Sequence, residues 1–462
     1  MEGKCQSLQI SHTYIIPSIL LPSHATFLVE VSLGVELYNT LMKLEHVFEN
    51  IDKALDYILT EESYALSNSK DRISPPEEIC MDKEKGVIRK VKTDSLESKF
   101  TGYFNNAGSE KFIMTRLASG RYALKPNLRF RKYLFRGQNK YYERCIPSLF
   151  RNPNQARFLS EAVLYQEMVL LMLSHPLVQL FDLGFELCGQ HYRFEMNVYG
   201  LCQHYYNKTV FADLTTDPNV AAFFATCKYN PDTDSYTPII DNSTEGVLYY
   251  YDIDIHEDFK LHGTLNSFPI STIGLQVFPR SERQKGFLVY IPKDKDFHSS
   301  PKLTAISFKH NAELSQKYYD MFDGGKQLFP DDILMQHWKR ENKDKKRISE
   351  ATLMMNEIEN PDEDKDKNRA QLITDGFIIE DYKPCFTEEE LETYYTRMPE
   401  EWNRICDCIY IPGDKNNELK DALRKLPANP QYSWAFNKGV SHTINYDEGY
   451  LLKIYKDCFV IK

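Results

Sequence analysis

The stretch LFRGQ, residues 134–138, constrains the fold of this chain more than any other. Its apolar start is typical of the end of a buried strand, and its polar end marks the turn that follows. Arg136 presents a planar fork of hydrogen-bond donors that suits a phosphate or a carboxylate. Gly137 allows another backbone or a ligand to come close. The same stretch also fits a structural role, in which Arg136 forms an ion pair with Asp213 or another acid.

The composition predicts a soluble cytoplasmic protein that does not cross a membrane. The apolar span at residues 14–37 is interrupted by prolines and a glutamate, and lacks the roughly 20 apolar residues that a bilayer requires. The ten cysteines are scattered without a CxxC pair, so we expect neither a metal site nor disulfides. The net charge of −10 disfavours nucleic acid as a partner, because phosphate affinity requires a basic face.

The length of 462 residues allows two or three domains of about 100–200 residues each, with flanking regions. Residues 1–95 are expected to be partly helical, because apolar residues recur at helical spacing between 34 and 59. Residues 96–340 hold the strand and helix signals of the main domain. Residues 341–369 are dense in charged side chains and predict a charged linker, or alternatively a solvated helix. Residues 370–462 predict a smaller region of mixed structure.

Local signals predict the start of several helices. Asp217 and Pro218 are typical of an N-cap and a first helical residue. Thr387 and Glu390 form a capping box, and Pro399 indicates a further helix start. The remaining patterns predict strands at 110–135, 209–215, 246–255, 286–291, 303–309, 450–455 and 459–461, and helices at 154–179 (ended or kinked by Pro176), 195–205, 312–322, 331–339 and 418–426.

Three segments between about residues 128 and 338 resemble the FRG-domain family, which is named for its Phe-Arg-Gly motif. Order, spacing and residue types agree in all three. The family has a second arginine at the position of Val210. This chain therefore keeps only the arginine of the Phe-Arg-Gly motif, Arg136. The matching segments are LFRGQ with Pro147-Ser148-Leu149 and Arg151; Gln203-His204-Tyr205 with Thr209–Thr215, Asp217-Pro218 and Ala221–Ala225; and Arg283-Gln284-x-Gly286-Phe287 with Leu328–Asp331.

The arrangement also resembles the ADP-ribosyltransferase fold. In those enzymes one strand carries an arginine and a glycine, a second carries Ser or Thr before a helix, and a third carries a glutamate that meets the ribose. The resemblance implies an α+β fold with a central mixed or antiparallel sheet and with helical and mixed flanking regions. The three places are taken here by Arg136-Gly137, Thr215-Thr216 and Glu282-Arg283-Gln284.

The resemblance implies NAD or a related nucleotide as substrate, and either ADP-ribosyl transfer or NAD cleavage as the activity. Such a reaction builds positive charge on the ribose, and it needs donors for the phosphates and an acceptor that stabilises this charge. The setting would be a toxin or phage defence, and the sequence does not identify the acceptor macromolecule. The implied roles are NAD binding by Arg136, Gly137, Thr216 and His204, and catalysis by Glu282, Gln284 and Thr215.

Each of these assignments has a structural alternative. Residues 215–217 also fit a strand end and a helix cap. His204 also fits a hydrogen-bonded structural role, and Glu282 fits an exposed charged turn. If the uncharged Gln284 occupies the catalytic place, transfer would be weak or absent. The chain would then be a non-catalytic module that binds a nucleotide or a protein, and its flanking regions would carry the interactions.

Overall fold

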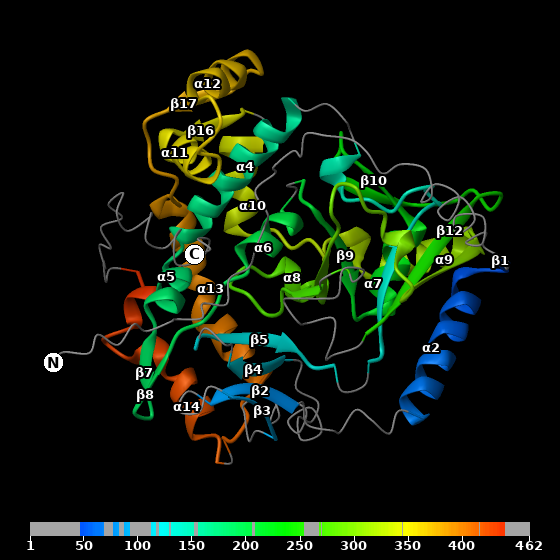
Figure 1. Cartoon of the computed structure of the whole chain (residues 1–462), viewed down its shortest axis with the longest axis horizontal. Coiled ribbons are helices and arrows are strands. Elements are labelled where there is room, and N and C mark those ends of the chain that lie inside the picture. The colour runs from blue at the N-terminus through cyan, green and yellow to red at the C-terminus, as the bar shows by residue number, and fades with distance from the viewer. Residues whose placement is uncertain are drawn as a thin grey trace.

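The computed structural model has the α+β architecture that the sequence predicts, with helices and strands in both halves of the molecule (Figure 1). The part of the predicted N-terminal helix before residue 47 and the predicted strands after residue 438 lie outside the described residues. The structure describes residues 47–68, 77–82, 87–92, 112–116, 120–128, 131–151, 156–205, 208–253, 268, 270–343, 345–414 and 416–438.

The centre of the molecule is a mixed sheet of seven strands. Its first two strands pair in parallel, and the other neighbours pair antiparallel, which agrees with the expected mixed sheet. The order across the sheet is β1 (Val47–Phe48), β15 (Leu303–Lys309), β12 (Glu245–Asp252), β6 (Tyr133–Gln138), β9 (Phe211–Thr215), β14 (Gly286–Tyr290) and β13 (Ile270–Thr272).

Side chains alternate between the two faces of this sheet, and each face has its own apolar core. One core contains Phe135 and Leu248, which pack against Ala221 and other helical residues. The other contains Leu134 and Tyr249. The helices of the first face are α2 (Ile51–Asn68), α7 (Pro218–Thr226) and α9 (Ala312–Met321), and Figure 1 shows all three on the same side of the molecule.

Helix α7 begins as the sequence predicts. The Asp217 side chain accepts a hydrogen bond from the N–H of Asn219, and Pro218 is the first helical residue. This cap satisfies one of the donors that the first helical turn leaves free. The helix therefore starts directly after strand β9 and returns across the sheet onto β6.

A second helical layer occupies the other half of the molecule (Figure 1). The predicted break at Pro176 is confirmed, since one helix ends before it and the next begins with it at a bend of 78°. Within the described residues no single helix is long and apolar enough to cross a membrane, although this bent pair could by length and composition alone. The helices are α4 (Ala156–Leu173), α5 (Pro176–Leu183), α6 (Val198–His204), α8 (Arg280–Arg283), α10 (Ile333–Trp338), α13 (Glu388–Asp407) and α14 (Glu418–Arg424).

Short strands complete the fold. They pair in groups of two or three that are separate from the central sheet. They are β2 (Glu77–Asp82) with β3 (Val87–Lys92); β4 (Phe112–Arg116) with β5 (Tyr122–Pro126) and β18 (Ile409–Tyr410); β7 (Phe185–Leu187) with β8 (Gln190–Tyr192); β10 (Cys227–Asn230) with β11 (Ser235–Pro238); and β16 (Arg347–Ser349) with β17 (Ile378–Glu380).

The prediction of a linker at residues 341–369 is wrong, because this segment holds regular structure that includes helices, the other alternative for it. It contains β16, helix α11 (Glu350–Glu359) and the first half of α12 (Lys365–Thr374). Ile348 and Leu353 are buried in a small core with Leu372. A few apolar residues at helical spacing suffice to anchor the segment, and its many charges lie on the outer surface.

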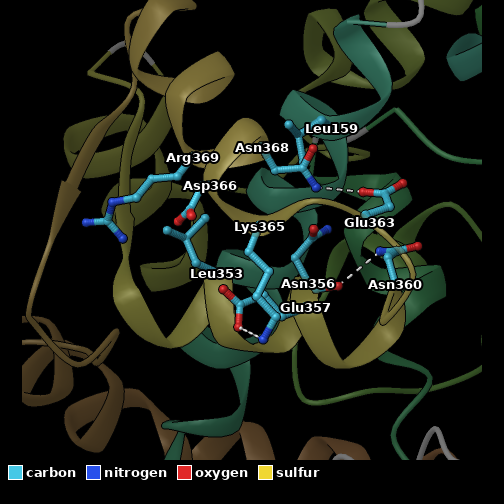
Figure 2. A pocket seen from close by; sticks show the side chains of 10 residues that line it. All are labelled: Leu159, Leu353, Asn356, Glu357, Asn360, Glu363, Lys365, Asp366, Asn368 and Arg369. Atoms are coloured by element: carbon cyan, nitrogen blue, oxygen red, sulfur yellow. Dashed lines mark hydrogen bonds and ion pairs between the residues drawn. The ribbon is translucent and has the colours of Figure 1, made fainter.

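A small cavity of about 180 Å³ lies where α11 and α12 meet the start of α4. Figure 2 shows amide and charged side chains around it, several of them already bound to each other. Lys365 pairs with Glu357, and Asn368 donates to Glu363. These contacts hold the loop between the two helices, so we regard this cavity as part of the packing of the segment.

The capping box at Thr387 and Glu390 is confirmed, with both of its hydrogen bonds present. The prediction that Pro399 starts a helix is wrong, because this proline lies inside α13. A proline in a helix interior costs about 3 kcal/mol. Met398 and Trp402 on either side are buried in the largest core, and this packing outweighs the local penalty.

Candidate functional site

The residues that the sequence marks as a site come from three neighbouring strands. Arg136 is in β6, Thr215 ends β9, and Gln284 precedes β14 by two residues. These strands are consecutive in the sheet, in the order β6, β9, β14. The fold therefore brings three segments that are far apart in the chain to neighbouring positions inside the sheet.

A gap in the ladder separates β6 from β9. In the described strands one registered pair joins them, Phe135 with Thr215, whereas β9 and β14 pair along five positions. The Nη1 atom of Arg136 donates to the backbone carbonyl of Asp213 at 2.9 Å, across this gap. The contact involves the main chain of Asp213, because its carboxylate accepts from Gln203 instead. Arg136 thus bridges two strands where the backbone hydrogen bonds stop.

The register places Arg136 and Thr215 on opposite faces of the sheet. Arg136 is registered with Tyr249, and registered antiparallel partners share a face. Thr215 is registered with Phe135, the neighbour of Arg136, and therefore points to the face that α7 covers. The two predicted site residues are close along the strands, but a single small ligand atom could not touch both side chains.

A polar cluster surrounds Arg136 on its own face. The Cys145 thiol is buried beside it, and burial raises the pKa of this thiol despite the lowering effect of the Arg136 charge. The Tyr249 hydroxyl lies 3.1 Å from Nε2 of His298. Partial removal from water and the nearby Arg136 charge both lower the pKa of Arg151. Two arginines therefore repel each other at the end of β6.

Several buried polar atoms near this gap have no hydrogen-bond partner in the described part of the chain. They are Nε of Arg136, Oε1 of Gln138 and Oδ1 of Asp213. Buried polar atoms are nearly always paired, so each exception needs a physical reason. Arg136 and Gln138 share one face of the sheet, so their two atoms can offer one donor and one acceptor to a bound polar molecule. Asp213 is two residues before Thr215 in β9, so its carboxylate points to the opposite face.

Thr215, Gln284 and His204 form a second, separate network on the opposite face. The Thr215 hydroxyl donates to the Gln284 carbonyl at 2.7 Å and accepts from the N–H of Asp217 at 3.0 Å. Oε1 of Gln284 lies 2.9 Å from Nδ1 of His204, and its amide donates to the carbonyl of Leu328 at 3.1 Å. Burial lowers the pKa of His204, which favours the neutral imidazole.

This network anchors a strand end and a helix cap, as the structural alternative for these residues proposes. Thr216 is also buried, and its N–H donates to the carbonyl of Lys285. The ammonium group of Lys285 in turn pairs with the Asp217 carboxylate at 2.7 Å. The same residues could contact a ligand only if it entered from the strand end, where Lys285 and Asp217 are partly exposed.

Gly137 serves the packing of α7. A Cβ atom at this position would lie 1.8 Å from the carbonyl oxygen of Ala221 and 2.7 Å from the nitrogen of Ala225. Only glycine allows the helix backbone to come this close to the strand. The glycine of the motif therefore admits another backbone, which is one of the two roles that the sequence predicts for it.

Glu282 is a buried residue and not part of an exposed turn, and its carboxylate is bound by another arginine than Arg136. It is 5 % exposed, and its carboxylate accepts from Nη1 and Nη2 of Arg404 at 3.3 and 3.2 Å. Arg404 is in α13 and also contacts Glu401. The acid proposed for catalysis is thus engaged with the C-terminal region. No local pattern predicts this pair, because its partners are 122 residues apart.

Arg151 is the site residue whose role sequence reasoning missed. It is part of the motif behind LFRGQ, but its position alone did not indicate that it approaches Arg136. A second arginine shortly after the Phe-Arg-Gly motif is the signal that could have predicted this approach. No group of three or more His, Cys, Asp or Glu side chains in the described part of the chain could hold a metal ion.

Comparisons with known proteins identify one family. Neither the curated proteins nor the solved structures gave a match. The family model of the FRG domain matches residues 131–234, a range that includes β6, α7 and the gap between β6 and β9. The chain therefore contains an FRG domain over these residues.

Proposed function

We propose that the FRG domain binds NAD or a related nucleotide at the gap between β6 and β9, with Arg136 as the phosphate contact. This proposal rests on the hydrogen bonding of the Arg136 guanidinium. Its Nη1 atom is fixed by the carbonyl of Asp213, while its buried Nε atom has no partner among the described residues. A guanidinium held in this way keeps donors for a phosphate.

The nearby Arg151 supports an anionic ligand. Besides burial, the charge of Arg136 lowers the pKa of Arg151, and two such charges side by side are electrostatically unfavourable without a negative charge between them. Phosphate oxygens would supply that charge and could accept from both side chains. The unpaired oxygen of Gln138, on the same face as Arg136, could accept from a ribose hydroxyl group. These features together favour a nucleotide over a simple anion.

ADP-ribosyl transfer or NAD cleavage is the second candidate function. The order of Arg136, Thr215 and the segment with Glu282 on consecutive strands favours it, because it matches the order in the resembling enzymes. Glu282 would have to leave Arg404 before it could stabilise positive charge on a ribose. We therefore rank ligand binding first, and a toxin or phage-defence setting follows only if the domain is catalytic.

The test is to titrate the purified chain with NAD and to measure nicotinamide release in the same samples. Saturable binding that Arg136→Ala removes, with no nicotinamide released, supports the binding module. Release of nicotinamide that Glu282→Gln abolishes supports the enzyme. A folded wild-type chain that binds neither NAD nor ADP-ribose would contradict both candidates.

A further inference from the structure

The loop that follows the Phe-Arg-Gly strand carries an exposed tyrosine beside the polar cluster around Arg136. Tyr141 is 42 % exposed and lies three residues after the end of β6. Its ring is nearly parallel to that of His298, with centroids 5.5 Å apart and an angle of 4° between the planes. Among the described residues this is the one ring that it contacts. The exposed part of the Tyr141 ring therefore has no aromatic partner within the described part of the chain.

The ring beneath Tyr141 is held by a second buried ring. His298 is buried, and the fully buried Tyr249 lies next to it at 5.6 Å, with an angle of 22° between the planes. The Tyr249 hydroxyl is 3.1 Å from Nε2 of His298, which fixes the imidazole. Tyr141 is thus the outer member of a row of three nearly parallel rings whose other two members are rigid parts of the core.

Hydrogen bonds hold the loop of Tyr141 at both ends. Oδ1 of Asp296 accepts from the N–H of Cys145 at 2.9 Å and from the N–H of His298 at 3.0 Å, so the loop and the imidazole share one anchor. Near the start of the loop, Nε2 of His310 lies 3.0 Å from the carbonyl oxygen of Asn139. A ring on a loop that is already ordered loses little conformational freedom when a ligand packs on it.

The row of rings leads from the surface to Arg136. Tyr249 is registered opposite Arg136, so the two side chains are neighbours on one face of the sheet. Burial lowers the pKa of His298, and the nearby charge of Arg136 acts in the same direction. A ligand whose anionic group is at Arg136 would therefore extend along this face toward the exposed ring of Tyr141.

We infer that Tyr141 stacks on the planar base of the nucleotide whose phosphate Arg136 binds, with the phosphate inside and the base at the surface. This inference rests on the proposed nucleotide site and adds the group that selects for a ring. Stacking uses the π-face that every base has, so it tolerates both an adenine and a nicotinamide ring. Tyr141 would thus distinguish nucleotides from phosphate compounds that lack a ring, such as pyrophosphate.

Tyr142 is the alternative platform, because it is 41 % exposed and adjacent in the chain. The ammonium group of Lys140 lies over its ring at 5.1 Å. In the part of the chain that the structure describes, no aromatic ring supports Tyr142 from below. A base that stacked on Tyr142 would have to order this side chain, whereas Tyr141 already lies on a buried ring. The geometry therefore favours Tyr141.

The experiment titrates the full chain with NAD and, separately, with pyrophosphate, and measures binding by calorimetry. Tyr141→Ala should weaken NAD roughly ten- to a hundredfold, the usual effect of removing a stacking ring. It should leave the affinity for pyrophosphate unchanged, because pyrophosphate has no ring. Tyr141→Phe keeps the ring and should bind NAD as the wild type does. Arg136→Ala should weaken both ligands.

Two further variants serve as controls. Tyr142→Ala should leave both affinities unchanged, and so should Tyr64→Ala, an exposed tyrosine in α2. NAD binding that requires Arg136 but is unchanged in Tyr141→Ala would overturn this inference and leave the proposed function standing. Equal weakening of NAD and pyrophosphate in Tyr141→Ala, or equal weakening of NAD in Tyr141→Ala and Tyr142→Ala, would also overturn it. A wild-type chain that binds neither ligand would contradict the proposed function itself.

Discussion

A methyl group on the α-carbon of Gly137 would lie 1.8 Å from the carbonyl oxygen of Ala221. The strand that carries the Phe-Arg-Gly motif and the helix that follows the next strand are therefore in direct backbone contact. This contact fixes the depth of Arg136, the preceding residue, relative to the gap between β6 and β9. The glycine thus positions the arginine, although it need not touch a ligand.

Gly137→Ala should destabilise the protein strongly. Overpacking a tight interior costs about 1–3 kcal/mol, and here the obstacle is backbone that cannot rotate away. Gly189→Ala is the control, because nothing lies within 4 Å of its Cβ position and only its positive φ of +74° opposes the change. Urea denaturation of both variants measures the difference. A Gly137→Ala variant as stable as Gly189→Ala would show that α7 shifts at little cost.

Arg136→Lys should weaken nucleotide binding by about 1.5–3 kcal/mol, because the charge remains but the fork of donors is lost. Its loss of stability should be near 1 kcal/mol, the value of the bond to the Asp213 carbonyl. Arg193→Lys is a control away from the site, since Arg193 donates to the backbone carbonyl of Asp182 and also pairs with its carboxylate. A large drop in melting temperature for Arg136→Lys with unchanged NAD affinity would make Arg136 a purely structural residue.

Arg404→Met should destabilise the chain by about 1–3 kcal/mol, because the buried Glu282 carboxylate then keeps only Arg283, at 3.9 Å, as a cationic neighbour. Adding Glu282→Gln to this variant should restore part of the loss, since the amide carries no charge. Thermal melts of the two single variants and the double variant form the cycle that measures the coupling. Strictly additive effects would mean that the two side chains do not interact in solution.

Glu390 should make stability depend on pH in the acid range. Burial raises the pKa of Glu390, but hydrogen bonds from His337 and from the N–H of Thr387 outweigh this effect and hold the pKa at about 2, below the ordinary value of 4.5. The carboxylate therefore stabilises the fold above pH 4.5, and this contribution is lost as the pH falls toward 2. Melting temperatures of wild type and Glu390→Gln should differ most at neutral pH and converge near pH 2. A constant difference would count against this assignment.

Local patterns predicted much of the fold because their causes are local. The strand at 303–309 has the predicted bounds, and the helix start at Asp217 follows from a side chain that caps its own backbone. The same holds for the capping box at Thr387. Such signals involve residues within four positions of each other, so no knowledge of the rest of the chain is needed.

The candidate site was predicted less completely because it depends on distant contacts. The adjacency of the strands that carry Arg136, Thr215 and Gln284 came from a resemblance to a family, and the structure has this strand order. The opposite faces of Arg136 and Thr215 depend on the register between strands, which sequence spacing does not determine. The engagement of Glu282 by Arg404 depends on the docking of α13.

The two-residue strand β1 has a consequence for the behaviour of the molecule at high concentration. It pairs in parallel with β15, with Val47 opposite Ser307 and Phe48 opposite Phe308. Strand β15 is seven residues long, and its outer edge would otherwise offer open amides and carbonyls to any passing strand. Val47 and Phe48 therefore cover part of this edge and reduce edge-to-edge self-association. A chain shortened to begin after Phe48 would expose this edge and should aggregate more readily than the longer one.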